Sequence, residues 1–135
     1  MSESVLTGNE QFVSEAAEFF VRDLETSMRF YVGGLGFRAI RQEPTFAVVA
    51  LGEAHLMLVV AGDENSSVQQ WLSTDPRGVG VNIRIMVEDV DAMYQLATKS
   101  GAIVNDIDDR TYGLRDFMVA DPDGFMLRFA SPIRK

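Results

Sequence analysis

Hydrophobic and polar residues alternate along several short stretches of this chain, a pattern that is typical of strands with two different faces. In the first stretch, Ala17, Phe19 and Val21 alternate with Ala16, Glu18 and Phe20. The second half repeats the pattern, with Val81, Ile83, Ile85 and Val87 alternating with Asn82, Arg84 and Met86. Other apolar runs predict strands at 37–42, 45–51, 55–60, 102–106, 115–120 and 125–130.

Two helices are expected, one after each of these alternating strands. Asp23 and Asp89 are suitable N-cap residues, because a short acidic side chain accepts hydrogen bonds from the free amides at the start of a helix. The first helix is expected to end at Gly33-Gly34 and the second at Gly101, since glycine favours helix termination.

The two halves of the chain are related by an internal repeat. Val21-Arg22-Asp23-Leu24 matches Val87-Glu88-Asp89-Val90, which lies 66 residues further on. We therefore expect one structural domain made of a first module at 16–61, a linker at 62–79 and a second module at 80–131, between tails at 1–15 and 132–135. Two helices cannot cover both faces of so many strands, so one face must enclose something else.

The composition narrows the class of partner. Of the 135 residues, 47% are hydrophobic and 24% are charged, which suits a globular domain with a core. The formal net charge of −8 and the pI near 4.5 argue against a nucleic-acid partner. The sequence has no cysteine, no signal-peptide pattern and no apolar run of membrane-spanning length. We expect a cytoplasmic protein without a membrane partner.

The stretch from Gly113 to Phe129 predicts a closing hairpin, in which Pro122 presets the backbone of a turn and Gly124 suits its last position. This stretch resembles the final hairpin of the glyoxalase/bleomycin-resistance/dioxygenase superfamily, also called vicinal oxygen chelate proteins. The resemblance extends over about residues 16–131. The motifs that carry it are Phe20-Val21-Arg22-Asp23-Leu24, Phe30-Tyr31, Leu35-Gly36-Phe37, Arg115-Asp116-Phe117 and Asp121-Pro122-Asp123-Gly124.

The resemblance implies an α+β fold in which two βαβββ modules form a curved mixed sheet that is shaped like a cup. Val21 and Val87 precede the helix caps and are expected to pack on the helices, as are Leu56, Leu58, Leu127 and Phe129. Residues of the opposite parity are then expected to face the cup. They are Ala16, Glu18, Phe20, His55, Met57, Val59, Asn82, Arg84, Met86, Met126, Arg128 and Ala130.

Metal-using members of this superfamily place His, Glu or Gln side chains at the centres of four cup strands. The resemblance aligns these positions with Ala16, Met57, Asn82 and Arg128. Alanine has no donor atom, a thioether is a poor ligand for hard divalent ions, and a guanidinium repels cations. We therefore expect no divalent metal and no other cofactor in the cup.

Two features of the expected cup each have two interpretations. Three charged residues are expected in it, namely Glu18, Arg84 and Arg128. In one interpretation Glu18 forms an ion pair with one arginine and the other arginine is solvated. In the other interpretation the unpaired guanidinium binds an anionic or carbonyl group of a ligand. His55 is either an exposed residue at the rim without a chemical role, or a general base.

The remaining expected lining is apolar and aromatic. Phe20, Met57, Val59, Met86 and Met126 form either an ordinary core or a pocket for an organic molecule, for which methionine is well suited. Trp71, Tyr112 and Phe117 are candidates for stacking on such a molecule, although Trp71 has the alternative role of packing its own loop.

Three functions follow from these alternatives. The first is a metal-free homodimer that, like the bleomycin-resistance branch, sequesters a small organic molecule such as an antibiotic without chemistry. The second is a metal-dependent lyase, isomerase or dioxygenase of the same superfamily, with His55 as ligand or base. The third is a structural or regulatory module whose cup is merely filled.

Overall fold

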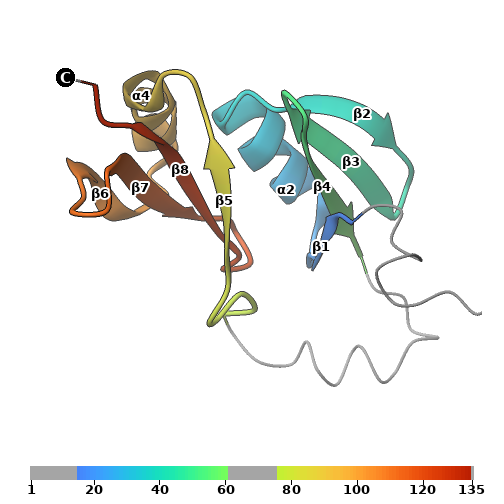
Figure 1. Ribbon diagram of the computed structural model, residues 1–135. Coiled ribbons are helices and arrows are strands. Elements are labelled where there is room, and N and C mark those ends of the chain that lie inside the picture. The colour runs from blue at the N-terminus through green and yellow to red at the C-terminus, as the bar shows by residue number, and fades with distance from the viewer. Residues whose placement is uncertain (1–14, 61–75, 135) are drawn as a thin grey trace, which may run out of the picture.

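The computed structural model describes residues 15–60 and 76–134 and contains two four-stranded sheets that lie side by side (Figure 1). The first sheet has the spatial order β1-β4-β3-β2 and consists of β1 (Ala17–Phe20), β2 (Arg38–Gln42), β3 (Phe46–Leu51) and β4 (Ala54–Val59). The second has the order β5-β8-β7-β6 and consists of β5 (Asn82–Met86), β6 (Ile103–Asp109), β7 (Leu114–Ala120) and β8 (Met126–Pro132).

Both sheets share one topology, which confirms the α+β fold made of two βαβββ modules. The first strand of each module pairs in parallel with the last, and the other neighbours are antiparallel. The repeat extends to single hydrogen bonds, since the Val21 amide donates to the Val59 carbonyl and the Val87 amide to the Ala130 carbonyl, both at 2.8 Å. The expected tail at 1–15 and linker at 62–79 lie largely outside the described residues.

The two helices begin at the predicted caps. Asp23 accepts a hydrogen bond from the Thr26 amide at the start of α2 (Leu24–Met28), and Asp89 accepts one from the Ala92 amide at the start of α4 (Val90–Ser100), each at 3.1 Å. The first helix continues as the π-helical segment η1 (Arg29–Gly34), which the sequence pattern did not indicate. Within residues 15–60 and 76–134, no helix has the length and apolar character needed to cross a membrane.

The core lies on the helix-facing sides of both sheets, which confirms the assigned parity of their strands. Leu56, Leu58, Leu127 and Phe129 are at most 1% exposed. Residues from the two modules form one apolar cluster, in which the ring of Phe19 stacks on that of Phe125 with centroids 4.4 Å apart. The two modules therefore share a single core.

The turn Asp121–Gly124 joins the second module to the first through its two carboxylates. Asp121 Oδ1 accepts the amides of Asp123 and Phe125, both at 2.9 Å, which shapes the turn itself. Asp121 Oδ2 accepts the buried hydroxyl of Tyr31 at 2.8 Å. Asp123 Oδ1 accepts the amide and the guanidinium of Arg22, at 3.1 and 2.8 Å. Side chains of the first module thus satisfy the acidic turn of the second.

Burial explains the titration behaviour of this contact. It raises the pKa of Asp121 above 3.8, although hydrogen bonds from Tyr31 and two amides act in the opposite direction. Burial and the neighbouring carboxylate of Asp121 raise the pKa of Tyr31 well above 10, so its hydroxyl stays a donor at neutral pH.

The last residue of the acidic turn must be glycine. Gly124 adopts a φ of 91°, and a Cβ there would lie 2.4 Å from that of Pro76, so only glycine fits this turn.

Replacing Tyr31 tests the contact between the modules. Tyr31→Phe removes the donor to Asp121 Oδ2 and leaves a buried acceptor unsatisfied, so we expect the free energy of unfolding to fall by about 1–3 kcal/mol. Urea denaturation at neutral pH measures this change.

Tyr94→Phe is the matched control. The Tyr94 hydroxyl donates to Asp106 Oδ1 at 3.1 Å in an exposed position, where water replaces the lost partner, and we expect a loss below about 0.5 kcal/mol. Equal losses for the two variants would contradict the importance of the buried bond.

Candidate functional site

The face of the second sheet that points away from its core carries the main polar cluster, and we call it the open face. It consists of Asn82, Arg84 and Met86 on β5, Met126, Arg128 and Ala130 on β8, and Asp116 and Met118 on β7. Arg84 and Arg128 are register partners on neighbouring parallel strands, and Met118 is the partner of Arg128 on the other side. The three side chains therefore form one row across the sheet.

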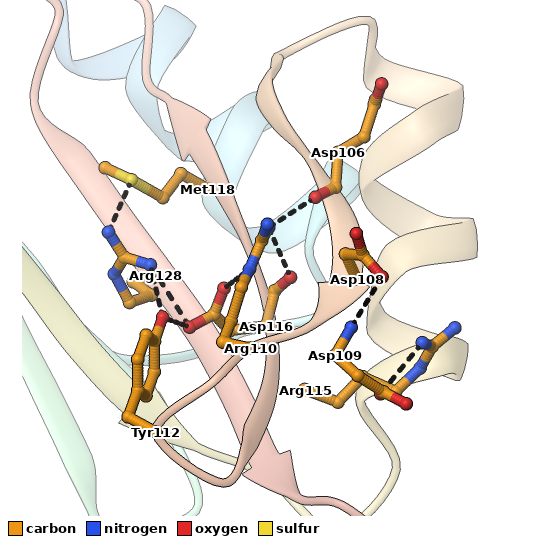
Figure 2. Close-up of polar contacts among 9 residues, drawn as sticks. All are labelled: Asp106, Asp108, Asp109, Arg110, Tyr112, Arg115, Asp116, Met118 and Arg128. Carbon is orange, nitrogen blue, oxygen red and sulfur yellow. Dashed lines mark hydrogen bonds and ion pairs between the residues drawn. The ribbon is translucent and has the colours of Figure 1, made fainter.

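Asp116 lies at the centre of this cluster (Figure 2). Its side chain is fully buried. Its Oδ1 accepts Nε of Arg110 at 2.8 Å, and its Oδ2 accepts Nη1 of Arg128 at 3.1 Å. The hydroxyl of Tyr112 also donates to Oδ2. One carboxylate thus serves two guanidinium groups and a phenol.

These donors decide the charge of Asp116. Burial alone would raise its pKa, but the hydrogen bonds from Tyr112, Arg110 and Arg128 outweigh burial, and the pKa lies below 3.8. Conversely, the bond to Asp116 raises the pKa of Tyr112 above 10. At neutral pH the carboxylate is therefore ionised, while the phenol is a neutral donor.

Arg84 differs from Arg128, although the two are register partners. Arg128 is held by Asp116, by the Tyr112 hydroxyl at 3.3 Å and by Met118 Sδ at 3.1 Å. Arg84 is exposed and forms no ion pair or hydrogen bond through its side chain within the described part of the chain. One guanidinium of the row is fixed and the other is available.

The ion pair between Glu18 and an arginine, one interpretation of the sequence, is not formed. Glu18 lies on β1 in the other sheet, and Arg128 pairs with Asp116 instead. Asp116 belongs to a motif of the closing hairpin but was not predicted as a site residue, although the alternation along β7 contained the signal. Phe117 packs in the core, so its neighbours Asp116 and Met118 must point to the open face.

A groove of about 720 Å³ runs along the seam between the two sheets. It is lined by Glu15–Ala17, Leu51–Leu56 and Ile83–Met86. A smaller hollow of about 280 Å³ shares Ala17 and Ile83 with this groove and includes Glu18. The seam thus brings His55, Arg84 and Met86 together, with Glu18 in the adjoining hollow.

His55 is exposed at the start of β4, in agreement with a position at the rim. Among the described residues, none hydrogen-bonds to its imidazole, so no carboxylate or carbonyl there orients the ring as catalytic bases require. This geometry gives no support to the alternative of a general base.

The other predicted site residues are dispersed. Phe20 and Met57 are half-buried on the first sheet, Asn82 is exposed on β5, and Tyr112 is 57% exposed beside Asp116. Trp71 lies outside the described residues.

The expected position of Phe117 is wrong. Its ring is fully buried on the helix side of β7, between the rings of Tyr94 and Phe129 at centroid distances of 5.1 and 5.5 Å. Alternation along β7 places Phe117 opposite to Asp116, so it cannot stack on a molecule at the open face.

The positions aligned with metal ligands do not suit a metal ion. They hold Ala16, Met57, Asn82 and Arg128, and the last of these is already bonded to Asp116. Across residues 15–60 and 76–134, no three His, Asp or Glu side chains lie close enough to bind one ion. A cation at this place would meet a guanidinium in place of a carboxylate.

The fold and the seam define a class of protein: paired βαβββ modules with a small-molecule-sized groove between their sheets. The sequence profile of the Glyoxalase/Bleomycin resistance protein/Dioxygenase superfamily matches residues 14–129. The chain therefore belongs to this superfamily, as its motifs indicated.

Known relatives agree with this assignment. The chain is 31% identical over 123 residues to the bleomycin resistance protein of Geobacillus stearothermophilus, a match that covers 84% of this chain and 92% of that protein. A bleomycin resistance protein of Staphylococcus aureus matches to the same extent.

Solved structures share the fold. TioX from Micromonospora sp. ML1 has a TM-score of 0.70 at 22% identity and covers 91% of this chain and 98% of its own. The bleomycin resistance determinant encoded on transposon Tn5 has a TM-score of 0.69 at 17% identity and covers 91% of this chain and 100% of its own.

Replacing Asp116 tests the polar cluster. Asp116→Asn keeps the shape but removes the charge that two partly exposed guanidinium groups share, so we expect a loss of about 1–3 kcal/mol in the free energy of unfolding at neutral pH. Because the folded-state pKa of Asp116 is depressed, its contribution is complete above pH 3.8 and is lost as the pH falls through the folded-state value.

The difference between wild type and Asp116→Asn in urea denaturation should therefore shrink below about pH 3.8. Asp108→Asn is the control. The exposed side chain of Asp108 accepts a local hydrogen bond from the Asp109 amide and no other hydrogen bond within the described residues. Its replacement should change the free energy of unfolding by less than about 0.5 kcal/mol. A pH-independent difference for Asp116→Asn would show that its charge is not what stabilises the cluster.

Proposed function

We propose that this protein binds a small organic molecule, such as an antibiotic, and holds it chemically unchanged without a metal ion. The observation that carries the proposal is Arg128, which occupies a metal-ligand position of the superfamily and is fixed there by Asp116. Lyase, isomerase and dioxygenase chemistry of the metal-dependent members needs a cation at this place.

The groove along the seam supports binding of a molecule of moderate size. Its volume of about 720 Å³ lies within the range that ligand pockets of proteins occupy. Leu51, Ile83 and Met86 are apolar residues of its lining, and Arg84 and His55 supply polar groups. Such a lining favours an organic body with a few polar substituents.

The relatives support the choice of antibiotic. Proteins named for bleomycin resistance match over most of this chain at 31% identity. Binding without turnover is sufficient for resistance, because a sequestered drug does not reach its target. The lack of an oriented base at His55, within the described residues, fits this mode of action better than catalysis.

Calorimetric titration tests the proposal. A panel of bleomycin and other acidic, neutral and cationic antibiotics is titrated into protein that has been treated with a chelator. We expect saturable binding of at least one compound, with a dissociation constant that is unchanged when divalent metal is added back. Mass spectrometry of the recovered compound should show its original mass.

Two results would contradict the proposal. Stoichiometric metal in the purified protein together with conversion of a bound compound would favour the enzyme. Failure of every compound in the panel to bind would favour a module whose interior is filled by its own side chains.

We also propose that the protein is a homodimer, in line with the bleomycin-resistance branch that it resembles. β5 is an outer strand of its sheet, and two exposed apolar side chains lie in the residues that lead into it. Val79 is 71% exposed and Val81 is 64% exposed. A second copy that covers this strip would remove it from water.

Multi-angle light scattering tests this proposal. We expect about twice the monomer mass of 15.0 kDa for the wild type, and a shift toward monomer for Val81→Asp. Val104→Asp on β6 is the control, because Val104 is also exposed, at 51%, but lies on the opposite edge of the sheet. A monomeric wild type, or equal effects of the two variants, would exclude this interface.

A further inference from the structure

We infer that the ligand carries an acidic group, a carboxylate, sulfonate or phosphate, which binds between Arg84 and Arg128 on the open face. The inference rests on the proposed binding function and adds the chemical class of the ligand. It goes beyond the names of the relatives, which identify an antibiotic but not the group that this chain would recognise.

The two arginines lie next to each other in the sheet. Arg84 and Arg128 are partners on adjacent parallel strands, which lie about 4.8 Å apart in a sheet. Their side chains leave the same face, because Ile83, Ile85, Leu127 and Phe129 point to the core. Two guanidinium groups side by side repel each other, and an anion between them would relieve this repulsion.

Positive charges outnumber the carboxylate that pairs with them around the two arginines. Asp116 neutralises part of the charge on Arg110 and Arg128, which share it. Arg84 adds a further positive charge, and no carboxylate among the described residues pairs with it. The open face therefore has an excess of positive charge, in a chain whose net charge is −8.

The acidic residues near the seam do not remove this excess. Glu15 and Glu53 line the same groove as Arg84, and Glu18 lines the adjoining hollow. None of the three forms an ion pair with Arg84 in the described part of the chain. Their charges lower affinity for an anion at a distance, so recognition depends on direct contact with the guanidinium groups.

Arg128 is preorganised by its neighbours. Its Nη1 is bound by Asp116 and by Tyr112, and its Nη2 lies 3.1 Å from Met118 Sδ (Figure 2). The side chain is still 24% exposed. A guanidinium that is already fixed loses little conformational entropy when an anion binds.

The two modules of the repeat differ at the position of the arginine pair. The central pair of the parallel strands is Glu18 with Met57 in the first module, and Arg84 with Arg128 in the second. The same fold therefore forms with a glutamate and a methionine at this position, and the pair of arginines is specific to the second module. A purely structural role would not require it.

The neighbours of the arginines indicate the rest of the ligand. Met118 lies in the same row of the sheet, and Met86, which is 51% exposed, lies in the next row on β5. Methionine side chains adapt to flat and irregular apolar surfaces. The class that fits is an organic acid with an apolar or aromatic body.

Three fluorescent dyes of similar size test the inference. 8-Anilino-1-naphthalenesulfonate is anionic, Nile red is neutral and thioflavin T is cationic. We expect the protein to bind the anionic dye more tightly than the cationic dye. Binding of the anionic dye should weaken as sodium chloride is raised, whereas binding of the neutral dye should not weaken.

The decisive variant is Arg84→Gln, because Arg84 is exposed and its replacement should leave the fold intact. Loss of one charge-assisted contact should weaken binding of the anionic dye about tenfold or more and leave the neutral dye unchanged. Arg38→Gln is the control, since Arg38 is an exposed arginine on β2, in the other sheet. It should leave all three affinities unchanged.

The outcomes separate the two levels of the proposal. If the neutral dye binds but Arg84→Gln does not affect the anionic dye, or if the cationic dye binds most tightly, the acidic class is wrong while the binding function stands. If none of the dyes binds, the binding function fails and the inference fails with it.

Discussion

The contact between the acidic turn Asp121–Gly124 and the first module determines how the two halves of this protein are joined. Tyr31 and Arg22 come from the first module, and they satisfy the carboxylates of Asp121 and Asp123 from the second. Because Tyr31 and the two carboxylates are buried, the turn cannot move away without leaving polar atoms unsatisfied. The stacked rings of Phe19 and Phe125 continue the contact into the core. The seam between β1 and β5, and with it the groove, depends on this junction.

On this common scaffold the two modules have diverged at their centres. Both begin with a parallel strand pair and an aspartate-capped helix. The second module alone has the buried Asp116, which converts one arginine from a mobile cation into a fixed donor and leaves Arg84 unpaired within the described residues. A position that the resemblance aligns with a metal ligand of the superfamily thereby holds a fixed guanidinium, to which the proposed function assigns a role in ligand binding.

Local rules predicted much of the fold. Alternation identified the strands and their core faces, and Asp23 and Asp89 marked the helix starts, because these features depend on neighbours within a few residues. The site was harder to predict. Asp116 on β7 bonds to Arg128 on the neighbouring strand β8, and the role of Tyr31 depends on a turn 90 residues further along the chain.

The errors have the same cause. The hairpin motif makes Phe117 a candidate for stacking, but only the parity of β7 shows that its ring points into the core. Alternation assigns Glu18 to a face of its strand but does not determine which charges on different sheets approach each other. Pairing across strands and modules requires the register, which the local pattern does not contain.

A crystal structure of the protein with an organic acid from the binding panel tests the central claim most directly. We expect density for the acid on the open face, with its anionic group within hydrogen-bond distance of the Arg84 guanidinium and next to Arg128. A metal ion at the centre of the cup, or an acid bound elsewhere with Arg84 paired to a carboxylate of the protein, would contradict it.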